Sequence, residues 1–276
     1  MTAIVCGLSA NQHINNNFFI LHFIWDNPEK PKAGQFFMMK PLHSSVFLQR
    51  PISVFEYNEE EKTLKFLITA RGKGTRELSE LKPGDNVFLT GPLGNAWADF
   101  LPKEETSSEV INGASSEASR GKTALVSGSV GIAPLAALAA EKPECDFDLY
   151  AGFKYGFCLK EEENAVLGGG LNAKKIIVTA EDGMNAPSGI VTDFLDDIER
   201  YNMVFGCGSI PMLRALKKKC ETNNVPCFIS LESRFACGVG ACLGCSIKTV
   251  KGNRCCCKDG PIFPAKDIIF DELNNE

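Results

Sequence analysis

The chain has 276 residues, and its 29 Lys and Arg against 34 Asp and Glu give a formal net charge of −5. The length suits two ordinary domains with a small appendix, and the negative charge argues against nucleic acid as a partner. The hydrophobic content of 44% and charged content of 23% are ordinary for a soluble globular protein, and no apolar stretch approaches the ~18 residues of a membrane span.

Cysteine usage is the unusual part of the composition. Of the 12 cysteines in the chain, six lie between Cys237 and Cys257. The N-terminus has no basic segment followed by an apolar core, so we expect no secretory signal and a cytoplasmic protein. In that reducing compartment, clustered cysteines hold a metal more often than they form disulfides. The composition therefore directs attention to the C-terminal part of the chain.

The first hundred residues have the pattern of an all-β domain. Short runs of apolar, aromatic and β-branched residues alternate with turn signals, and no helix of ten or more residues is indicated. The predicted strands are residues 18–24, 46–49, 64–68 and 87–89. Regularly spaced short strands predict a small barrel or sandwich over residues 1–100.

Residues 103–122 are rich in Ser and Glu and poor in apolar side chains. Such a segment cannot bury enough surface to offset its ordering entropy. We therefore predict a disordered linker or insert over residues 101–122, at a domain boundary.

From Thr123 the pattern changes to alternating strands and helices. The predicted strands are residues 124–127, 147–151, 176–179, 203–206 and 228–231. The predicted helices are residues 134–140, residues 191–201, and one that has Pro211 in its first turn. This alternation predicts a doubly wound α/β domain over residues 123–230, with a parallel sheet and helices on both faces. Residues 231–276 form a separate tail rich in cysteine and glycine.

A glycine turn in the β region has the features of a phosphate site. Gly72, Gly74 and Thr75 follow a strand and lead into a short helical start, where free N–H groups and the helix dipole favour an anion. Arg50 could clamp the same pyrophosphate. A tight β-turn and a surface arginine explain these residues equally well when each is taken alone.

Two glycine turns follow strands of the α/β region. One spans residues 128–134 and opens the first helix, and the other is Gly206-Cys207-Gly208. Both lie at carboxyl ends of strands, where open α/β sheets bind dinucleotides. The alternative is a pair of close-packed strand-to-helix turns, with Cys207 as a small buried hydrophobe.

Cys237, Cys242 and Cys245 have the spacing C-x4-C-x2-C, which plant-type ferredoxins use for three thiolates of a [2Fe-2S] cluster. The fourth thiolate must come from three consecutive cysteines, residues 255–257. A structural zinc site usually takes two separate Cys knuckles, so zinc suits this spacing poorly. A run of buried free cysteines is the remaining alternative.

The order of these motifs resembles the ferredoxin–NADP⁺ reductase superfamily. Within it, residues 231–245 and the ending 257–263 are similar to the electron-transfer subunits of class 1B dihydroorotate dehydrogenases. The resemblance implies an FAD-binding antiparallel β-barrel, an NAD-binding α/β domain and a small [2Fe-2S] domain, and it covers nearly the whole chain except the insert.

The resemblance also implies site residues. For FAD they are Arg50, Pro51, Ile52, Ser53, Leu67, Ile68, Thr69, Gly74 and Thr75. For NAD they are Gly128, Gly131, Ala133, Pro134, Gly206 and Gly208, with Cys207 near the nicotinamide. The implied cluster ligands are Cys237, Cys242, Cys245 and Cys257, the last because it directly precedes the Asp-Gly-Pro ending. Three serines depart from the family's nucleotide turns: Ser127, Ser129 and Ser209.

The implied function is electron transfer in pyrimidine biosynthesis. A partner catalytic subunit oxidises dihydroorotate on its own FMN, and electrons pass through the cluster and FAD to NAD⁺, in a heterotetramer of two plus two subunits. One alternative is a related reductase subunit that serves a hydrogenase, a sulfite reductase or an NADPH–ferredoxin transhydrogenase. Another is a zinc-binding sensor or scaffold without enzymatic activity. The sequence leaves NAD against NADP open.

Overall fold

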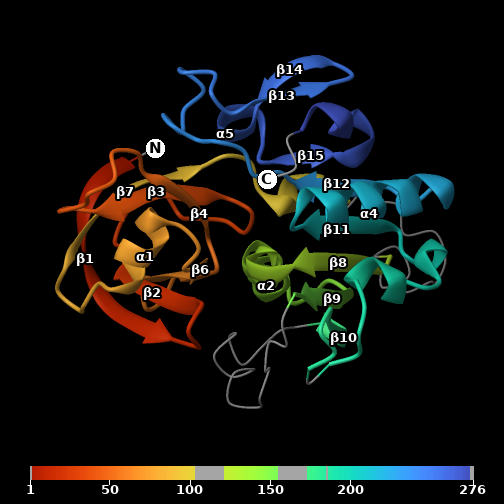
Figure 1. The fold of residues 1–276 in the computed structure, drawn as a ribbon, viewed down its shortest axis with the longest axis horizontal. Helices are drawn as coiled ribbons and strands as arrows, with labels where there is room; N and C mark the ends of the chain where they lie inside the picture. The colour runs from red at the N-terminus through yellow and green to blue at the C-terminus, as the bar shows by residue number, and fades with distance from the viewer. Residues whose placement is uncertain (1, 103–120, 155–172, 185, 274–276) are drawn as a thin grey trace, which may run out of the picture.

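The computed structural model describes residues 2–102, 121–154, 173–184 and 186–273. The predicted insert at 103–122 lies almost wholly outside these residues. Figure 1 shows a barrel-like sheet, drawn in red to orange, beside an α/β sheet in green to cyan, with the blue C-terminal segment next to both. Within the described residues, no helix is long and apolar enough to cross a membrane.

The N-terminal sheet is antiparallel and has the strand order β4-β3-β7-β1-β2-β6-β5. Its edge strands β4 and β5 are joined by only Val54 and Phe55, so the sheet curls toward closure. Its interior is filled by buried residues such as Phe23, Phe37 and Phe66. The strands are β1 (Thr2–His13), β2 (Phe18–Ile24), β3 (Phe36–Pro41), β4 (Arg50–Ser53), β5 (Glu56–Asn58), β6 (Thr63–Thr69) and β7 (Asn86–Leu93), accompanied by α1 (Lys73–Ser79) and η1 (Trp97–Phe100).

The strand predicted at residues 46–49 is wrong. The chain is irregular there, and β4 begins at Arg50. The apolar run marks no buried face, because Phe47 is 91% exposed. The hydroxyls of Ser44 and Ser45 instead donate to the Glu77 carboxylate of α1, which holds this stretch as a loop.

The α/β sheet has the order β10-β9-β8-β11-β12-β15, with five parallel strands and an antiparallel edge strand β15. Leu125 and Phe205 pack toward the core that contains α2, whereas Val126 and Val204 pack toward the core that contains Leu216 of α4. Alternate residues of a strand point to opposite faces, so helices cover both faces, which confirms the doubly wound prediction. The elements are β8 (Thr123–Gly128), η2 (Ser129–Gly131), α2 (Ile132–Glu141), β9 (Phe147–Phe153), β10 (Ala173–Ala180), β11 (Met203–Cys207), α4 (Ile210–Thr222), β12 (Cys227–Ser230) and β15 (Ile262–Pro264).

The helix predicted over residues 191–201 is wrong, although its apolar pattern marked buried positions. Two short 3-10 helices stand there, η3 (Val191–Phe194) and η4 (Ile198–Arg200). Asp197 between them has a φ of 52°, in the left-handed region that ends a right-handed helix. Leu195 and Ile198 are nevertheless buried.

The barrel and the α/β sheet share one core. Leu67 of β6 and Trp97 belong to the same buried cluster as Phe205 of β11, and the rings of Trp97 and Phe205 are 5.0 Å apart. The two units are therefore held in one relative position by apolar packing.

The C-terminal segment contains a hairpin of β13 (Ser246–Thr249) and β14 (Gly252–Cys255), then α5 (Cys256–Asp259), η5 (Ala265–Asp267) and η6 (Phe270–Glu272). It begins after β12 and returns through β15, which pairs with β12. Leu231 N–H donates to the Pro261 carbonyl at 2.9 Å, so the two ends of residues 231–261 lie side by side. Phe235 packs on Phe36 of the barrel, with ring centroids 5.1 Å apart.

Candidate functional site

The cysteine loop, residues 237–245, and Cys257 of α5 come together at one place. The sulfurs of Cys245 and Cys257 are 3.2 Å apart, although the residues are far apart in the chain. Gly240 N–H donates to the Cys257 sulfur at 3.0 Å, which ties the outer part of the loop to α5. The structure thus brings the implied fourth ligand to the C-x4-C-x2-C loop.

Each of the four implied ligand sulfurs accepts a backbone N–H hydrogen bond. Cys237 accepts from Val239 and Cys242, both at 3.4 Å, Cys242 accepts from Gly244, and Cys245 accepts from the Cys257 N–H at 3.5 Å. Such N–H donors stabilise thiolates and adjust the potential of a cluster bound to them. The loop therefore suits an anionic iron-sulfur group by its donors as well as its ligands.

Positive φ angles produce this arrangement. Gly238 and Gly240 have φ of 72° and 80°, and Leu243 has 58°, a conformation that L residues rarely adopt. A Cβ on Gly238 would also come 2.7 Å from Cγ of Met38. The first glycine is thus required both for the turn and for the close approach of the loop to β3.

The protonation of the cluster cysteines depends on burial. N–H groups of Cys242 and Val239 lower the pKa of Cys237 to about 6, whereas burial and the adjacent Cys245 raise the pKa of Cys257 to about 12. The exposed sulfur is thus prepared as a thiolate. A bound metal centre would supply the positive charge that the buried sulfur needs to lose its proton.

The two neighbouring cysteines are turned elsewhere. The sulfur of Cys255 is 3.6 Å from Ser246 Oγ, and Cys256 is fully buried, with burial raising its thiol pKa to about 12. Through the described ranges, no group of three or more His, Cys, Asp or Glu side chains is arranged to hold a single metal ion. The spacing of Cys237, Cys242 and Cys245, with Cys257 next to them, supplies the four thiolates that a [2Fe-2S] cluster takes.

Two of the implied FAD residues meet at the rim of the barrel. A Cβ on Gly74 would lie 2.7 Å from Nε of Arg50, so the N-terminus of α1 faces the arginine of β4. The helix begins at Lys73, and Gly74 and Thr75 therefore lie inside its first turn rather than before it. The Thr75 hydroxyl is occupied, since it accepts the N–H groups of Arg71 and Gly72, each at 3.1 Å.

The remaining FAD candidates divide by exposure. Leu67 and Ile68 are buried, each with 2% of its surface exposed, so their side chains belong to the core. Pro51, Ile52 and Ser53 are half-buried on the edge strand β4. The Thr69 hydroxyl is buried without a partner, and a buried polar atom without a partner is expected to meet a ligand or a water. This orphan hydroxyl suits a flavin beside β6.

The two nucleotide turns touch backbone to backbone. A Cβ on Gly208 would lie 2.9 Å from the Gly128 nitrogen, and one on Gly131 would lie 2.2 Å from the Cys207 carbonyl oxygen. Gly206 is instead packed by a side chain, since its Cβ would lie 2.6 Å from Cδ2 of Leu216. Close packing thus explains these glycines, and the side chain of Met212 lies against two of them, Gly128 and Gly208. Ala133 and Pro134 are buried in the first turn of α2.

Cys207 lies in a protected position near a carboxylate that the sequence analysis missed. Burial, together with the charge of Glu232, raises the pKa of the Cys207 thiol to about 12, so the thiol stays neutral near pH 7. Glu232 itself is exposed to solvent. The sequence could have indicated Glu232 by its position alone, because it lies two residues beyond Ser230, the residue that pairs with Cys207.

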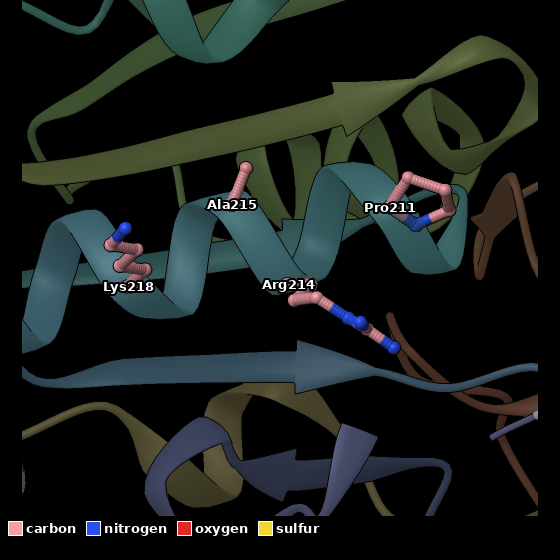
Figure 2. Close-up of a pocket in the computed structure, with 4 residues that line it drawn as sticks. All are labelled: Pro211, Arg214, Ala215 and Lys218. Carbon is pink, nitrogen blue, oxygen red and sulfur yellow. The ribbon is translucent and has the colours of Figure 1, made fainter. Parts of the chain in front are cut away.

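Two cavities adjoin α4. Figure 2 shows the first, of about 310 Å³, along the outer side of the helix, where Pro211, Arg214, Ala215 and Lys218 line it. The second, which we name the edge cavity, has about 190 Å³ and lies at the carboxyl ends of β9 and β10. Its lining consists of Gly152, Phe153, Glu181, Gly189, Ile190, Val191, Thr192, Ser209, Pro211, Met212 and Ala215.

Comparison with known proteins agrees with this geometry. The family model described as the iron-sulfur cluster binding domain of dihydroorotate dehydrogenase B matches residues 232–269. The chain is 37% identical over 241 residues to the dihydroorotate dehydrogenase B (NAD(+)) electron transfer subunit of Clostridium acetobutylicum, covering 87% of each chain. It is 35% identical to the protein of the same name from Caldanaerobacter subterraneus, covering 95% of this chain and 96% of that one.

Solved structures support the same fold. The structure of an NADH-dependent reduced ferredoxin-NADP oxidoreductase matches with a TM-score of 0.77 and 25% identity, over 98% of this chain and 91% of that chain. A ferredoxin NADP+ reductase from Neisseria gonorrhoeae with bound FAD and NADP matches with a TM-score of 0.60 and 15% identity, over 80% and 92% of the two chains, which shows the fold alone. On the identity and coverage of its curated relatives, the chain belongs to the family of dihydroorotate dehydrogenase B (NAD(+)) electron transfer subunits.

Proposed function

We propose that this chain passes electrons from a catalytic partner subunit to NAD⁺ during dihydroorotate oxidation in pyrimidine biosynthesis. The observation that carries the proposal is the set of four cysteine sulfurs, each with a backbone N–H donor, on a loop that packs against the barrel. When bound, the [2Fe-2S] cluster supplies one-electron chemistry and FAD joins it to the two-electron reduction of NAD⁺. The protein supplies positions and electrostatics.

In this proposal Cys237, Cys242, Cys245 and Cys257 hold the cluster. The contact of Gly238 with Met38 and Leu93 places the loop directly on β3 and β7 of the barrel. Such packing would hold a bound cluster beside the barrel. The domain division that goes with it is 1–100, 101–122, 123–230 and 231–276.

For FAD, we assign the pyrophosphate to Arg50 and the N-terminal turn of α1. The guanidinium is oriented through Nη1, which donates to the carbonyls of Leu48 and Gln49 at 3.1 and 3.3 Å. Its remaining N–H groups can therefore face an anion. The backbone of Pro51, Ile52 and Ser53 lines one side and the Thr69 hydroxyl another, with Leu67, Ile68, Gly74 and Thr75 shaping the support.

For NAD, we assign the pyrophosphate to the carboxyl edge formed by Gly128, Gly131, Gly206 and Gly208, of which Gly128 and Gly208 are half-buried and the other two buried, with Ala133 and Pro134 fixing the start of α2. N–H groups of the first turns of α2 and α4 attract anions there. Cys207 would lie beside the nicotinamide, and its thiol would stay neutral there, since burial raises its pKa to about 12.

The name of the relatives, electron transfer subunit, implies a catalytic partner, and we propose that this partner carries FMN in an assembly of two plus two subunits. Val239 and Leu243, which flank the cluster cysteines, are 40% and 63% exposed and would be covered in such a complex. Every described cysteine is free of disulfides, which supports a cytoplasmic site of action. Native mass measurement of the co-expressed complex tests the stoichiometry.

The decisive experiment is co-purification of the chain with its partner under anaerobic conditions. We expect FAD, FMN, iron and sulfide in the complex, together with dihydroorotate-dependent reduction of NAD⁺. A colourless, zinc-containing chain without flavin would contradict the proposal.

A second candidate function is favoured by the overall match to the ferredoxin-NADP oxidoreductase structure, with its TM-score of 0.77. A chain of this fold could serve such a partner as a reductase subunit. If the co-purified complex contained no FMN and ignored dihydroorotate but exchanged electrons between ferredoxin and NAD(P)H, this candidate would replace the first.

A further inference from the structure

Asn95, which follows β7 of the barrel, binds the backbone that comes after the fourth implied cluster ligand. Its side-chain Nδ2 donates to the Ile262 carbonyl at 2.9 Å, and its Oδ1 accepts the Ile262 N–H at 3.0 Å. One side chain thus binds both backbone groups of Ile262, as a residue of a neighbouring strand would do. Asparagine can do this because one planar amide group carries both a donor and an acceptor.

Two further contacts of Asn95 extend toward Cys257. The Asn95 N–H donates to the Gly260 carbonyl at 2.8 Å, and Nδ2 lies 3.5 Å from the Asp259 carbonyl oxygen. Asp259 is the last residue of α5, the short helix that contains Cys257. The contacts of this one barrel residue therefore reach from the end of α5 to the first residue of β15.

The barrel backbone packs tightly at the same place. A Cβ on Gly94, which has a φ of 79°, would lie 2.6 Å from Cδ of Pro261. On the barrel side, the Gly94 carbonyl accepts the side-chain amide of Gln35 at 3.0 Å. The stretch that carries Asn95 is thus fixed to the barrel and also touches the segment after α5, so it leaves that segment little freedom to move.

The helix α5 transmits this restraint to the ligand sulfur. Cys255 is the N-cap of α5, and its N–H donates to Oδ2 of Asp259 at 2.7 Å, so the two ends of the helix are tied to each other. Between them, the Cys257 sulfur accepts the Gly240 N–H at 3.0 Å and lies 3.2 Å from the Cys245 sulfur. A displacement of Asp259 would therefore move the Cys257 sulfur against the cysteine loop.

The end of β7 contacts both parts of the implied ligand set. Leu93, its last residue, would lie 3.2 Å from a Cβ placed on Gly238 in the cysteine loop. Asn95, two residues later, binds the segment that follows Cys257. One short stretch of the barrel thus holds the loop of the first three cysteines and the helix of the fourth against the same surface.

We propose that Asn95 is a positioning residue for the cluster, which fixes α5, and through it the Cys257 sulfur, relative to the barrel. The inference deepens the proposed function and rests on it, because it requires that Cys257 is a ligand and that the barrel binds FAD. In this role Asn95 touches neither cofactor. It acts through the backbone of residues 259–262, and it keeps the Gly240 N–H directed at the Cys257 sulfur.

The test compares two variants of the full chain, purified anaerobically with FAD and cluster. Asn95→Ala removes every side-chain contact. Asn95→Asp keeps the acceptor for the Ile262 N–H but loses the donor, and it decides the test if Asn95→Ala does not fold. We expect the EPR spectrum and the reduction potential of the cluster to change in both variants, because the Gly240 N–H bond to the Cys257 sulfur is displaced. Loss of iron to a chelator should be about tenfold faster, as when a group that orients a metal ligand is removed.

Asn11→Ala and Asn11→Asp are the matched controls. Asn11 lies on β1, and its Nδ2 donates to the carbonyls of Ser79 and Leu81 at 2.9 and 2.8 Å, so it makes the same kind of bond within the barrel. These variants should lower the free energy of unfolding without changing the EPR spectrum or the potential. If the Asn95 variants keep the wild-type spectrum and potential, or if the Asn11 variants change them equally, the inference is overturned.

Failure of this inference is distinguishable from failure of the proposed function. A wild-type chain that contains zinc or no metal would overturn both. If the wild-type complex reduces NAD⁺ with dihydroorotate and the Asn95 variants keep its spectrum and potential, only the role of Asn95 is lost. If the variants behave as expected while dihydroorotate oxidation is absent, the partner assignment is lost and Asn95 keeps its role.

Discussion

The cysteine loop at 237–245 and the nucleotide turns at 128–131 and 206–208 both rely on glycine, but in different ways. In the cysteine loop, Gly238 and Gly240 adopt positive φ so that N–H groups face sulfur. In the nucleotide turns, Gly131 and Gly208 have no such angle, and they are required because backbone from the other turn occupies the place of a Cβ. The first site is built from cysteine side chains whose sulfurs accept backbone hydrogen bonds. The second is built from close backbone contacts that only glycine permits.

The cysteine thiols of the two regions differ in their pKa. Cys237 is exposed enough for N–H groups to lower its pKa to about 6, whereas burial raises the pKa of Cys207 to about 12. In the proposed function, one residue type thus serves as a metal ligand in one region and as a neutral thiol beside the nucleotide in the other. Burial and local donors decide the role, not the residue type.

The largest expected effect is on the cysteine loop. Cys257→Ser should abolish the cluster, because it removes the sulfur that joins α5 to the loop through Cys245 and Gly240. Iron and sulfide per FAD, with the visible spectrum after anaerobic purification, measure the loss. Cys255→Ser is the control and should keep the cluster, since its sulfur faces Ser246. Equal loss in both variants would contradict the assignment of the fourth ligand.

The next effect is on the nucleotide turns. Gly131→Ala should cost roughly 2 kcal/mol of unfolding free energy and weaken ADP-ribose binding, because its Cβ would lie 2.2 Å from the Cys207 carbonyl oxygen. The spectrum of the bound cluster should not change. Gly7→Ala is the matched control: nothing lies within 4 Å of its Cβ. Chemical denaturation measures the stability and calorimetry measures the binding. If Gly131→Ala is as stable as the control, the backbone of the two turns can move apart to accommodate the added methyl group.

A smaller effect is expected where the cysteine loop meets the barrel. Phe36→Leu removes the ring that packs on Phe235 at 5.1 Å and should destabilise the chain by about 1 kcal/mol. The rate of cluster loss under a chelator should rise modestly if this contact supports the loop. If the rate equals that of the wild-type chain, the contact with the barrel does not stabilise the cysteine loop.

The smallest effect concerns pH. The Cys207 thiol, with a pKa of about 12, keeps its proton between pH 6 and 9, so Cys207→Ala should leave the shape of the pH profile of NADH oxidation by an artificial acceptor unchanged in that range. The ordinary pKa of a cysteine thiol is 9.0. As the pH rises above this value, the Cys207 thiol loses its proton in the unfolded chain but keeps it in the folded chain. The folded state therefore loses stability as pH rises toward 12. Denaturation at several pH values should show a shallower decline for Cys207→Ala.

Sequence reasoning reached the fold through elements with a strong pattern. β2 and β6 are rich in apolar and aromatic residues, and the strands around α2 and α4 alternate regularly with helices, so the barrel and the doubly wound sheet could be predicted. β15 could not, because three residues carry no periodicity and its partner β12 lies far upstream. Residues 191–201 misled for another reason: their apolar spacing is helical, but Asp197 interrupts the helix at a left-handed position.

The site was predictable where chemistry resides in side chains. The cysteine spacing indicates the cluster directly. Glu181 and Glu232 lie in no motif, and only the structure shows that they follow the ends of β10 and β12. The contact of Arg50 with Gly74 likewise joins residues that a sequence can only place in separate motifs. The structure was needed to show which residues from separate parts of the sequence lie close together.

The pairing of β12 with β15 has a consequence for the way in which the chain could lose its iron. Residues 231–261 leave the sheet and return to it at neighbouring positions, joined by the Leu231–Pro261 hydrogen bond. The segment is thus a closed excursion from the α/β sheet, and its outer part packs on the barrel through Phe235 and Gly238. Its ends would stay in place if the metal left, so the excursion could unravel and be rebuilt around new iron while the barrel and the parallel strands remained folded.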